Sequence, residues 1–152
     1  MVRLITKDGL RKLNEELEDR KVRLRQEIAK AIKEAKEQGD LSENAEYAEA
    51  KSQQNENESR ISELEMIVKN SQVVEKDEKI KGAQVGSIVK VKSGGTEMEF
   101  TIVGSNEADP ARFKISNESP LGKAFMGHDG GDSVSVLTPK GETITYKIVE
   151  VK

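Results

Sequence analysis

The first half of the chain repeats apolar side chains at spacings of three, four and seven residues, the period of one face of an α-helix. One run begins after Thr6, a residue suited to cap a helix, and a second run ends near Val68. The apolar positions are Leu10, Leu13, Leu17, Leu24, Ile28, Ala31, Ile32 and Ala35 in the first run, and Ala45, Ala48, Ile61, Leu64, Ile67 and Val68 in the second. This pattern predicts two long helices.

Only a few residues separate the two predicted helices. Gly39 favours the left-handed conformation that ends a helix, and Asp40-Leu41-Ser42-Glu43 has the pattern of a capping box that begins the next one. Helices joined so closely fold back on each other, which predicts an antiparallel coiled-coil hairpin with its tip at residues 38–44. Gln54 and Asn57 fall in the predicted seam, where polar residues fix register at a cost in stability.

The second half contains all three prolines and most of the glycines, and its apolar residues alternate in short runs, as is typical of strands and turns. The predicted elements are strands at Ser87–Lys92, Met98–Val103, Phe113–Ser116, Ser133–Leu137 and Thr143–Val151, and a short helix at Leu121–Met126. The sequence therefore predicts an α+β fold. We expect a helical hairpin over residues 1–76, a charged linker over residues 77–81 and a small antiparallel sheet domain over residues 82–152.

Composition narrows the possible functions. Of the 152 residues, 34% are hydrophobic and 35% are charged, whereas typical domains are nearer about 45–50% and 25%. The absence of cysteine, with a single histidine at His128, excludes disulfide scaffolds, thiolate metal sites and cysteine nucleophiles. A net charge of -3 argues against a general duplex-DNA binder. Since no apolar run approaches the roughly 18–20 residues of a membrane span, we expect a soluble protein without membrane contact. The absence of cysteine fits a cytoplasmic protein. We also expect the chain to be monomeric when free.

The strongest candidate for chemistry is the acidic pair at the predicted tip. Asp40 and Glu43 lie three residues apart at a helix start, so their carboxylates can approach within about 5–6 Å and share a Mg²⁺ ion. The alternative is that they only cap the helix, and spacing by itself favours that alternative. The tip contains no histidine and no further ligands, so the pair is better suited to completing another protein's active site than to forming one alone.

Two lysines flank the same tip. Lys36 precedes the break in the helices and Lys51 follows it, so both can hold a phosphate backbone near the acids, which would otherwise repel it. The alternative, which is commoner for isolated lysines, is ordinary helix-surface charge paired with Glu34 or Glu37.

The tip sequence Gly39-Asp40-Leu41-Ser42-Glu43-Asn44-Ala45-Glu46-Tyr47 closely resembles the motif of the bacterial Gre transcript-cleavage factors. The resemblance continues in two further blocks, Thr6-Lys7-Asp8-Gly9-Leu10 and Ser119-Pro120-Leu121-Gly122-Lys123-Ala124, and then in Thr138-Pro139-Lys140-Gly141. It implies an N-terminal coiled coil and a C-terminal domain of FKBP-like fold.

The resemblance also implies a function as a transcription elongation factor. In that family the globular domain docks at the secondary channel of RNA polymerase, and the coiled coil places its tip acids at the polymerase active site. Asp40 and Glu43 would there help to hold a Mg²⁺ ion, so that the polymerase hydrolyses the 3′ end of backtracked RNA. The chain itself would be no enzyme and would bind no cofactor tightly alone. The resemblance assigns Lys36 and Lys51 to nucleic-acid contact, and the docking contact to Pro120 and Leu121.

The chain departs from that family in the polar run over residues 53–58, where relatives usually carry apolar residues. An alternative function is an interaction or chaperone-like module, a coiled coil on a domain with prolyl-isomerase or client-binding activity. The aromatic side chains of the C-terminal domain make a poor proline pocket for that activity, since they are only Phe100, Phe113, Phe125 and Tyr146.

Overall fold

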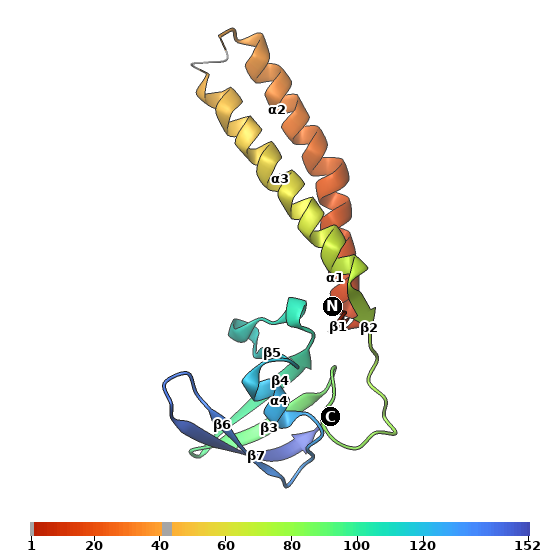
Figure 1. Ribbon diagram of the computed structural model, residues 1–152, viewed down its shortest axis with the longest axis vertical. Helices are drawn as coiled ribbons and strands as arrows, with labels where there is room; N and C mark the ends of the chain where they lie inside the picture. Colours follow the sequence, from red (N-terminus) through yellow and green to blue (C-terminus); the bar gives the residue numbers. More distant parts are fainter. Residues whose placement is uncertain (1, 41–43) are drawn as a thin grey trace. The chain divides into compact units, whose positions relative to one another are not determined.

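The computed structural model describes residues 2–40 and 44–152, which form two compact units (Figure 1). One unit combines Met1–Leu10 with Ser71–Lys152, and the other is Arg11–Asn70. The sequence pattern placed the division at residues 77–81 instead. The difference arises because a strand before the first helix pairs with a strand after the last helix, which brings both segments into the globular unit.

The helical part of the chain is a hairpin, as predicted. Its first arm runs through α1 (Lys7–Asp19), a π-helical turn η1 (Arg20–Leu24) and α2 (Arg25–Glu37). The chain returns through α3 (Ala45–Lys69), which packs against α2 (Figure 1). Thr6 caps α1, since its Oγ1 accepts a hydrogen bond of 3.0 Å from the Gly9 amide. Within the described ranges, no helix is long and apolar enough to cross a membrane.

The returning arm presents a regular coiled-coil seam. Its buried and half-buried positions alternate by three and four residues: Tyr47, Ala50, Gln54, Asn57, Ile61, Leu64 and Val68. The predicted positions Ala45 and Ala48 are wrong, because both are exposed. Tyr47 and Ala50 take their place, since the heptad that contains Ile61 and Leu64 continues without interruption to the start of α3.

The seam of the first arm advances unevenly. Its positions near the π turn are Leu13, Leu17, Arg20, Leu24 and Ile28. Two successive steps of four residues there replace the alternation of three and four that a coiled coil requires. A π turn holds more residues per turn than an α turn, so η1 accommodates the additional spacing of the two four-residue steps. Ile28 and Ala35 therefore stay buried in the seam.

The globular unit contains a five-stranded sheet in the order β5-β4-β3-β7-β6. The strands are β3 (Ile88–Ser93), β4 (Thr96–Val103), β5 (Lys114–Ser116), β6 (Ser133–Leu137) and β7 (Thr143–Val151). The prediction of a purely antiparallel sheet is wrong at one pair, because β5 runs parallel to β4. The connection between these strands is no tight hairpin: it passes through two short 3-10 turns, Ser105–Glu107 and Pro110–Arg112.

One face of this sheet forms the core of the globular unit. Val89, Val91, Ile102 and Ile148 are fully buried there, together with Phe125 of the short helix α4 (Pro120–Phe125). The sheet, α4 and the helical hairpin confirm the predicted α+β fold class.

A second, two-stranded parallel sheet was not predicted. It pairs β1 (Arg3–Ile5) with β2 (Ser71–Val73), and Ile5 is almost completely buried. The Glu107 carboxylate reinforces this region, because it accepts hydrogen bonds from the amides of Thr6 at 2.9 Å and Gly104 at 3.0 Å and also from the Thr6 hydroxyl. The first turn of α1 is thereby attached to the globular unit.

Candidate functional site

The predicted tip begins where α2 ends. Gln38 follows the helix as its C-cap, and Gly39 has a φ of 114°, a left-handed conformation that side chains with a Cβ rarely adopt. Gly39 therefore ends the helix as the sequence predicted. Asp40 follows directly and is exposed.

The cap of the returning helix differs from the prediction. Asn44 is the N-cap of α3, since its Oδ1 accepts a hydrogen bond of 3.1 Å from the Tyr47 amide. Its Nδ2 also donates to the Ala35 carbonyl at 2.7 Å, which joins the end of α2 to the start of α3. The prediction of Asp40 as N-cap is therefore wrong. A side-chain amide can donate and accept at once, and a carboxylate cannot make both bonds.

The acidic pair is described only in part. Asp40 belongs to the described residues, whereas Glu43 lies outside them, so the approach of the two carboxylates stays a prediction. The alternative to metal binding was that Asp40 caps the second helix. Asn44 makes that capping bond instead. Glu46 adds a further exposed acid in the first turn of α3, where the helix dipole favours negative charge.

The two flanking lysines lie on the arms that meet at the tip. Lys36 is exposed in the last turn of α2, where a positive charge complements the helix dipole. Lys51 is exposed on α3, and its Nζ donates to Gln54 Oε1 at 2.8 Å. Of the two acidic partners in the alternative interpretation, Glu34 and Glu37, the first has its Oε1 3.9 Å from Lys30 Nζ instead.

The sequence predicts that Asp40 and Glu43 hold a metal ion shared with another protein, and this stays a prediction because Glu43 lies outside the described residues. Among residues 2–40 and 44–152, no group of three or more histidine, cysteine, aspartate or glutamate side chains is placed to hold a metal. A Mg²⁺ ion often takes only one or two protein carboxylates and completes its shell with water and substrate phosphates. Asp40 and Glu43 would supply that number, and the rest of the shell would come from elsewhere.

The predicted docking residues line an apolar groove in the globular unit. Ser119 caps α4 by accepting a hydrogen bond of 3.0 Å from the Gly122 amide, which places Pro120 and Leu121 in the first turn. The groove has a volume of about 300 Å³ and is lined by Ile115, Ser119, Pro120, Leu121, Val136, Leu137, Thr138, Pro139, Ile144 and Tyr146. Leu137, which lines this groove, is 65% exposed.

The aromatic residues of the globular unit mostly contact one another. Phe100 lies 5.7 Å from Phe113 and 5.8 Å from Phe125 between ring centroids, and Phe125 is completely buried. Tyr146 is the one aromatic side chain that lines the groove among the residues described there. An aromatic proline pocket, which the alternative function requires, therefore has only one of its four candidate rings in the groove.

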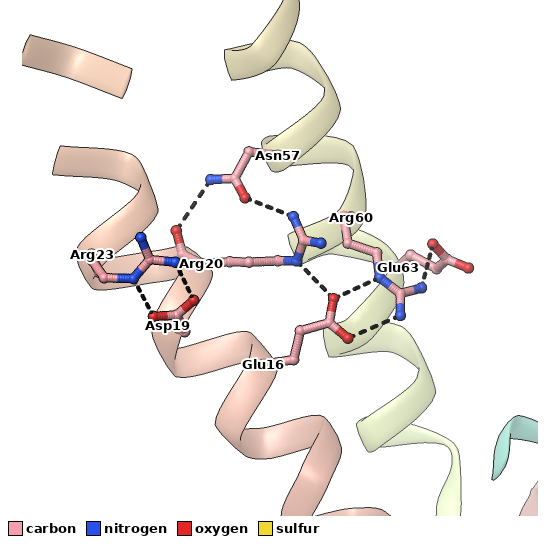
Figure 2. A network of polar contacts seen from close by, with 7 residues as sticks. All are labelled: Glu16, Asp19, Arg20, Arg23, Asn57, Arg60 and Glu63. Atoms are coloured by element: carbon pink, nitrogen blue, oxygen red, sulfur yellow. Dashed lines mark hydrogen bonds and ion pairs between the residues drawn. The ribbon is translucent and has the colours of Figure 1, made fainter. Parts of the chain in front are cut away.

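A polar network between the hairpin arms was predicted only in part: the sequence placed Asn57 in the seam, but the contacts of Glu16, Arg20 and Arg60 were missed. Figure 2 shows Glu16 and Arg20 on the first arm facing Asn57 and Arg60 on α3; we call these four residues the polar layer. Arg60 first, and then Arg20, hold the pKa of the Glu16 carboxyl below its ordinary value through hydrogen bonds. The signal that could have revealed this layer was the arginine at a seam position.

Comparison with known proteins matches each half of the chain to a family model of transcription elongation factors. A family model described as "Transcription elongation factor, N-terminal" matches residues 3–73, and one described as "Transcription elongation factor, GreA/GreB, C-term" matches residues 78–152.

Individual relatives match along almost the whole chain. The chain is 50% identical over 152 residues to the transcription elongation factor GreA of Thermoanaerobacter pseudethanolicus, across 98% of this chain and 96% of that protein. It is 47% identical over 152 residues to GreA of Clostridioides difficile, across 98% of this chain and 95% of that protein. The crystal structure of GreA factor homolog 1 of Thermus thermophilus matches 100% of this chain and 99% of its own at 31% identity, with a TM-score of 0.46.

Proposed function

Because the chain belongs to the GreA/GreB family of transcription elongation factors, we propose that it binds RNA polymerase and stimulates cleavage of backtracked RNA at the 3′ end. The polymerase carries out the hydrolysis, and the chain is a factor that activates it, not a hydrolase itself. We propose the tip of the hairpin as the part that acts at the polymerase active site.

The observation that carries this proposal is the hairpin with its acidic turn. α3 has 25 residues, and a helix of that length extends about 37 Å. Asp40 follows the end of α2 directly and is exposed, and α3 begins at Ala45. A slender two-helix arm with the exposed Asp40 at its turn suits delivery of carboxylates into a narrow site on a larger protein.

In this proposal Asp40 and Glu43 contribute carboxylate oxygens to a Mg²⁺ ion that the polymerase also holds. When bound, the ion supplies a Lewis acid for phosphodiester hydrolysis and lowers the pKa of a coordinated water. Carboxylate oxygens of Asp40 and Glu43 that do not contact the ion would accept hydrogen bonds from the attacking water and orient it. Lys36 and Lys51 offset the negative charge of the acids and of the RNA phosphates near the tip.

The groove that contains Pro120 and Leu121 is the proposed docking surface for the polymerase. Its apolar lining and the exposed Leu137 offer a surface that water solvates poorly, and burial against a partner would be favourable. Docking through this groove and catalysis through the tip would then be separable by mutation.

Transcript cleavage in halted elongation complexes tests the role of the tip. Asp40→Asn and Glu43→Gln should each abolish stimulated cleavage and still compete with the unmodified factor for polymerase. Glu46→Gln is the matched control, because it removes an exposed acid from the same end of the hairpin and should retain cleavage. Normal cleavage by either tip variant would refute the proposal.

Leu137→Ser tests the docking groove. The variant should raise the factor concentration needed for half-maximal cleavage, and cleavage at saturation should be unchanged. Val149→Ser on β7 is the control, because Val149 is 43% exposed and does not line the groove. Equal half-maximal concentrations for the two variants would exclude the groove as the docking surface.

A further inference from the structure

The polar layer interrupts the apolar part of the seam between the two arms. Asn57 is 3% exposed and occupies a heptad position between Ala50 and Leu64, which are both buried. A leucine at such a position would bury more apolar surface, so a buried asparagine gives up stability and in coiled coils typically specifies alignment.

The side chain of Asn57 bonds to a residue of the opposite arm, Arg20. Its Nδ2 donates to the Arg20 main-chain carbonyl at 3.1 Å, and its Oδ1 accepts from the Arg20 guanidinium at 3.2 Å (Figure 2). Gln54, the neighbouring polar seam residue, instead bonds to Lys51 on its own helix. Of these two seam residues, Asn57 is therefore the one that can sense how the arms are aligned.

The carbonyl that Asn57 recognises belongs to the first residue of the π turn. The amide of Arg25 also donates to this Arg20 carbonyl, which is the i to i+5 hydrogen bond of a π helix. The Glu16 carboxylate contacts the side chain of the same arginine and links it to α3, because it accepts hydrogen bonds from Arg20 Nε at 2.7 Å and from Arg60 Nε at 3.0 Å. Asn57 of α3 and Glu16 of α1 thus both bond to Arg20, the first residue of the π turn, and Arg60 bonds to Glu16.

We infer that the polar layer pins the π turn at Arg20–Leu24 and so sets the rotation and level of α2 against α3. α2 carries Lys36 and leads directly to Asp40, so the polar layer would act as a set of positioning residues for the tip. This inference rests on the proposed function for its consequence in cleavage and on the structure alone for the alignment.

The size of the effect follows from helix geometry. If the π turn reverted to an α turn, each later residue of α2 would be displaced by one helical step, which is a rotation of about 100° and a rise of about 1.5 Å. Errors of about 1 Å in the placement of catalytic groups are enough to slow enzymatic steps strongly. The alignment of α2 therefore matters for carboxylates that must meet a metal held by another protein.

Spin-label distances in the free, full-length chain test the alignment. The sequence contains no cysteine, so Lys33→Cys and Ser59→Cys, at exposed positions on α2 and α3, give a unique label pair. In this background Asn57→Leu and the double variant Asn57→Leu with Arg20→Leu should keep or raise the melting temperature. Both should add a second distance population, since a label on α2 moves when that helix rotates. Glu63→Gln is the control and should keep one distance, because Glu63 bonds to Arg60 within α3.

Cleavage assays with the unlabelled variants test the consequence. The saturating cleavage rate should fall in proportion to the population that has lost the native distance, and the half-saturating concentration should be unchanged. A single native distance in both leucine variants would overturn the inference. A shifted distance with full cleavage would overturn its functional half. Asp40→Asn separates the two proposals, because it should lose cleavage with the native distance intact; normal cleavage by Asp40→Asn would refute the proposed function and leave the distance result unaffected.

Discussion

Replacing Glu16 by glutamine tests an ionic contact between the two arms. The Glu16 carboxylate accepts from Arg20 Nε at 2.7 Å and from Arg60 Nε and Nη2 at 3.0 and 3.1 Å. Both bonds from Arg60 cross from α3 to α1, so they contribute to the association of the arms. Glutamine keeps the shape but presents an amide N–H₂ where one of the guanidinium groups needs an acceptor.

The expected loss follows from these bonds and from the exposure of the side chain. A buried hydrogen bond to a charged group contributes about 1.5–3 kcal/mol, and an exposed ion pair about 0–1 kcal/mol. The Glu16 side chain is 33% exposed, between these limits. Since glutamine retains one acceptor, we expect Glu16→Gln to lower the unfolding free energy of the hairpin by about 1–2 kcal/mol at pH 7.

The pKa of Glu16 makes this loss dependent on pH. Hydrogen bonds from Arg60 and then Arg20 lower the folded-state pKa below the ordinary 4.5, so the carboxylate's contribution is fully present above that value. It is lost as the pH falls through the lowered folded-state pKa. Urea unfolding, followed by the helical signal in circular dichroism, should therefore show a lower unfolding free energy for Glu16→Gln than for the parent chain at pH 7. This difference in unfolding free energy should shrink in acid.

Asp19→Asn provides the control for this measurement. Asp19 accepts from Arg23 at 2.7 and 2.8 Å, but both residues lie on the first arm and are about half exposed. Its replacement should change the stability much less than Glu16→Gln does. This account of the polar layer would be refuted if Glu16→Gln and the parent chain had the same unfolding free energy at pH 7. It would also be refuted if the difference between their unfolding free energies stayed constant down to pH 3.

Three further substitutions test other parts of the structure. Asn44→Ala should lower hairpin stability by about 1–2 kcal/mol in urea unfolding, because it removes the cap of α3 and the bond to α2; an unchanged midpoint would contradict the cap assignment. Glu107→Gln should speed hydrogen exchange at the Thr6 amide about ten-fold or more, since a charge-assisted bond is weakened; exchange at the parent rate would argue against the attachment. Gly122→Ala should destabilise the globular unit by about 1–3 kcal/mol in thermal unfolding, because a Cβ there meets the Ser116 carbonyl; an unaltered melting temperature would be inconsistent with that packing.

Much of the fold follows from local patterns in the sequence. β6 and β7 occupy the predicted ranges Ser133–Leu137 and Thr143–Val151, because alternation over five or more residues on a half-buried strand is a strong signal. The hairpin, its N-cap at Thr6 and its stop at Gly39 were predicted for similar reasons. Each of these features depends on residues close together in the chain.

The errors occur where partners come from distant parts of the chain. β1 and β2 have three residues each, too few to show a period, and they form only because the two segments meet. Asn44 replaced Asp40 as the cap because the Ala35 carbonyl across the turn offered its amide a second bond. Local sequence rules treat aspartate and asparagine as nearly equal caps, so they could not decide between the two.

For the candidate site, the acids, the lysines and the docking residues were all predicted from the sequence alone, because the motif around Asp40 and the order of the blocks are local features, and the roles of these residues stay predictions. Tertiary structure decided the rest: the partner of Asn57, the place of the π turn and the groove around Pro120. These depend on which side chains two separate helices or strands bring to the same level. Spacing along one segment specifies the face that a residue occupies, and only packing against the other segment specifies what that residue touches.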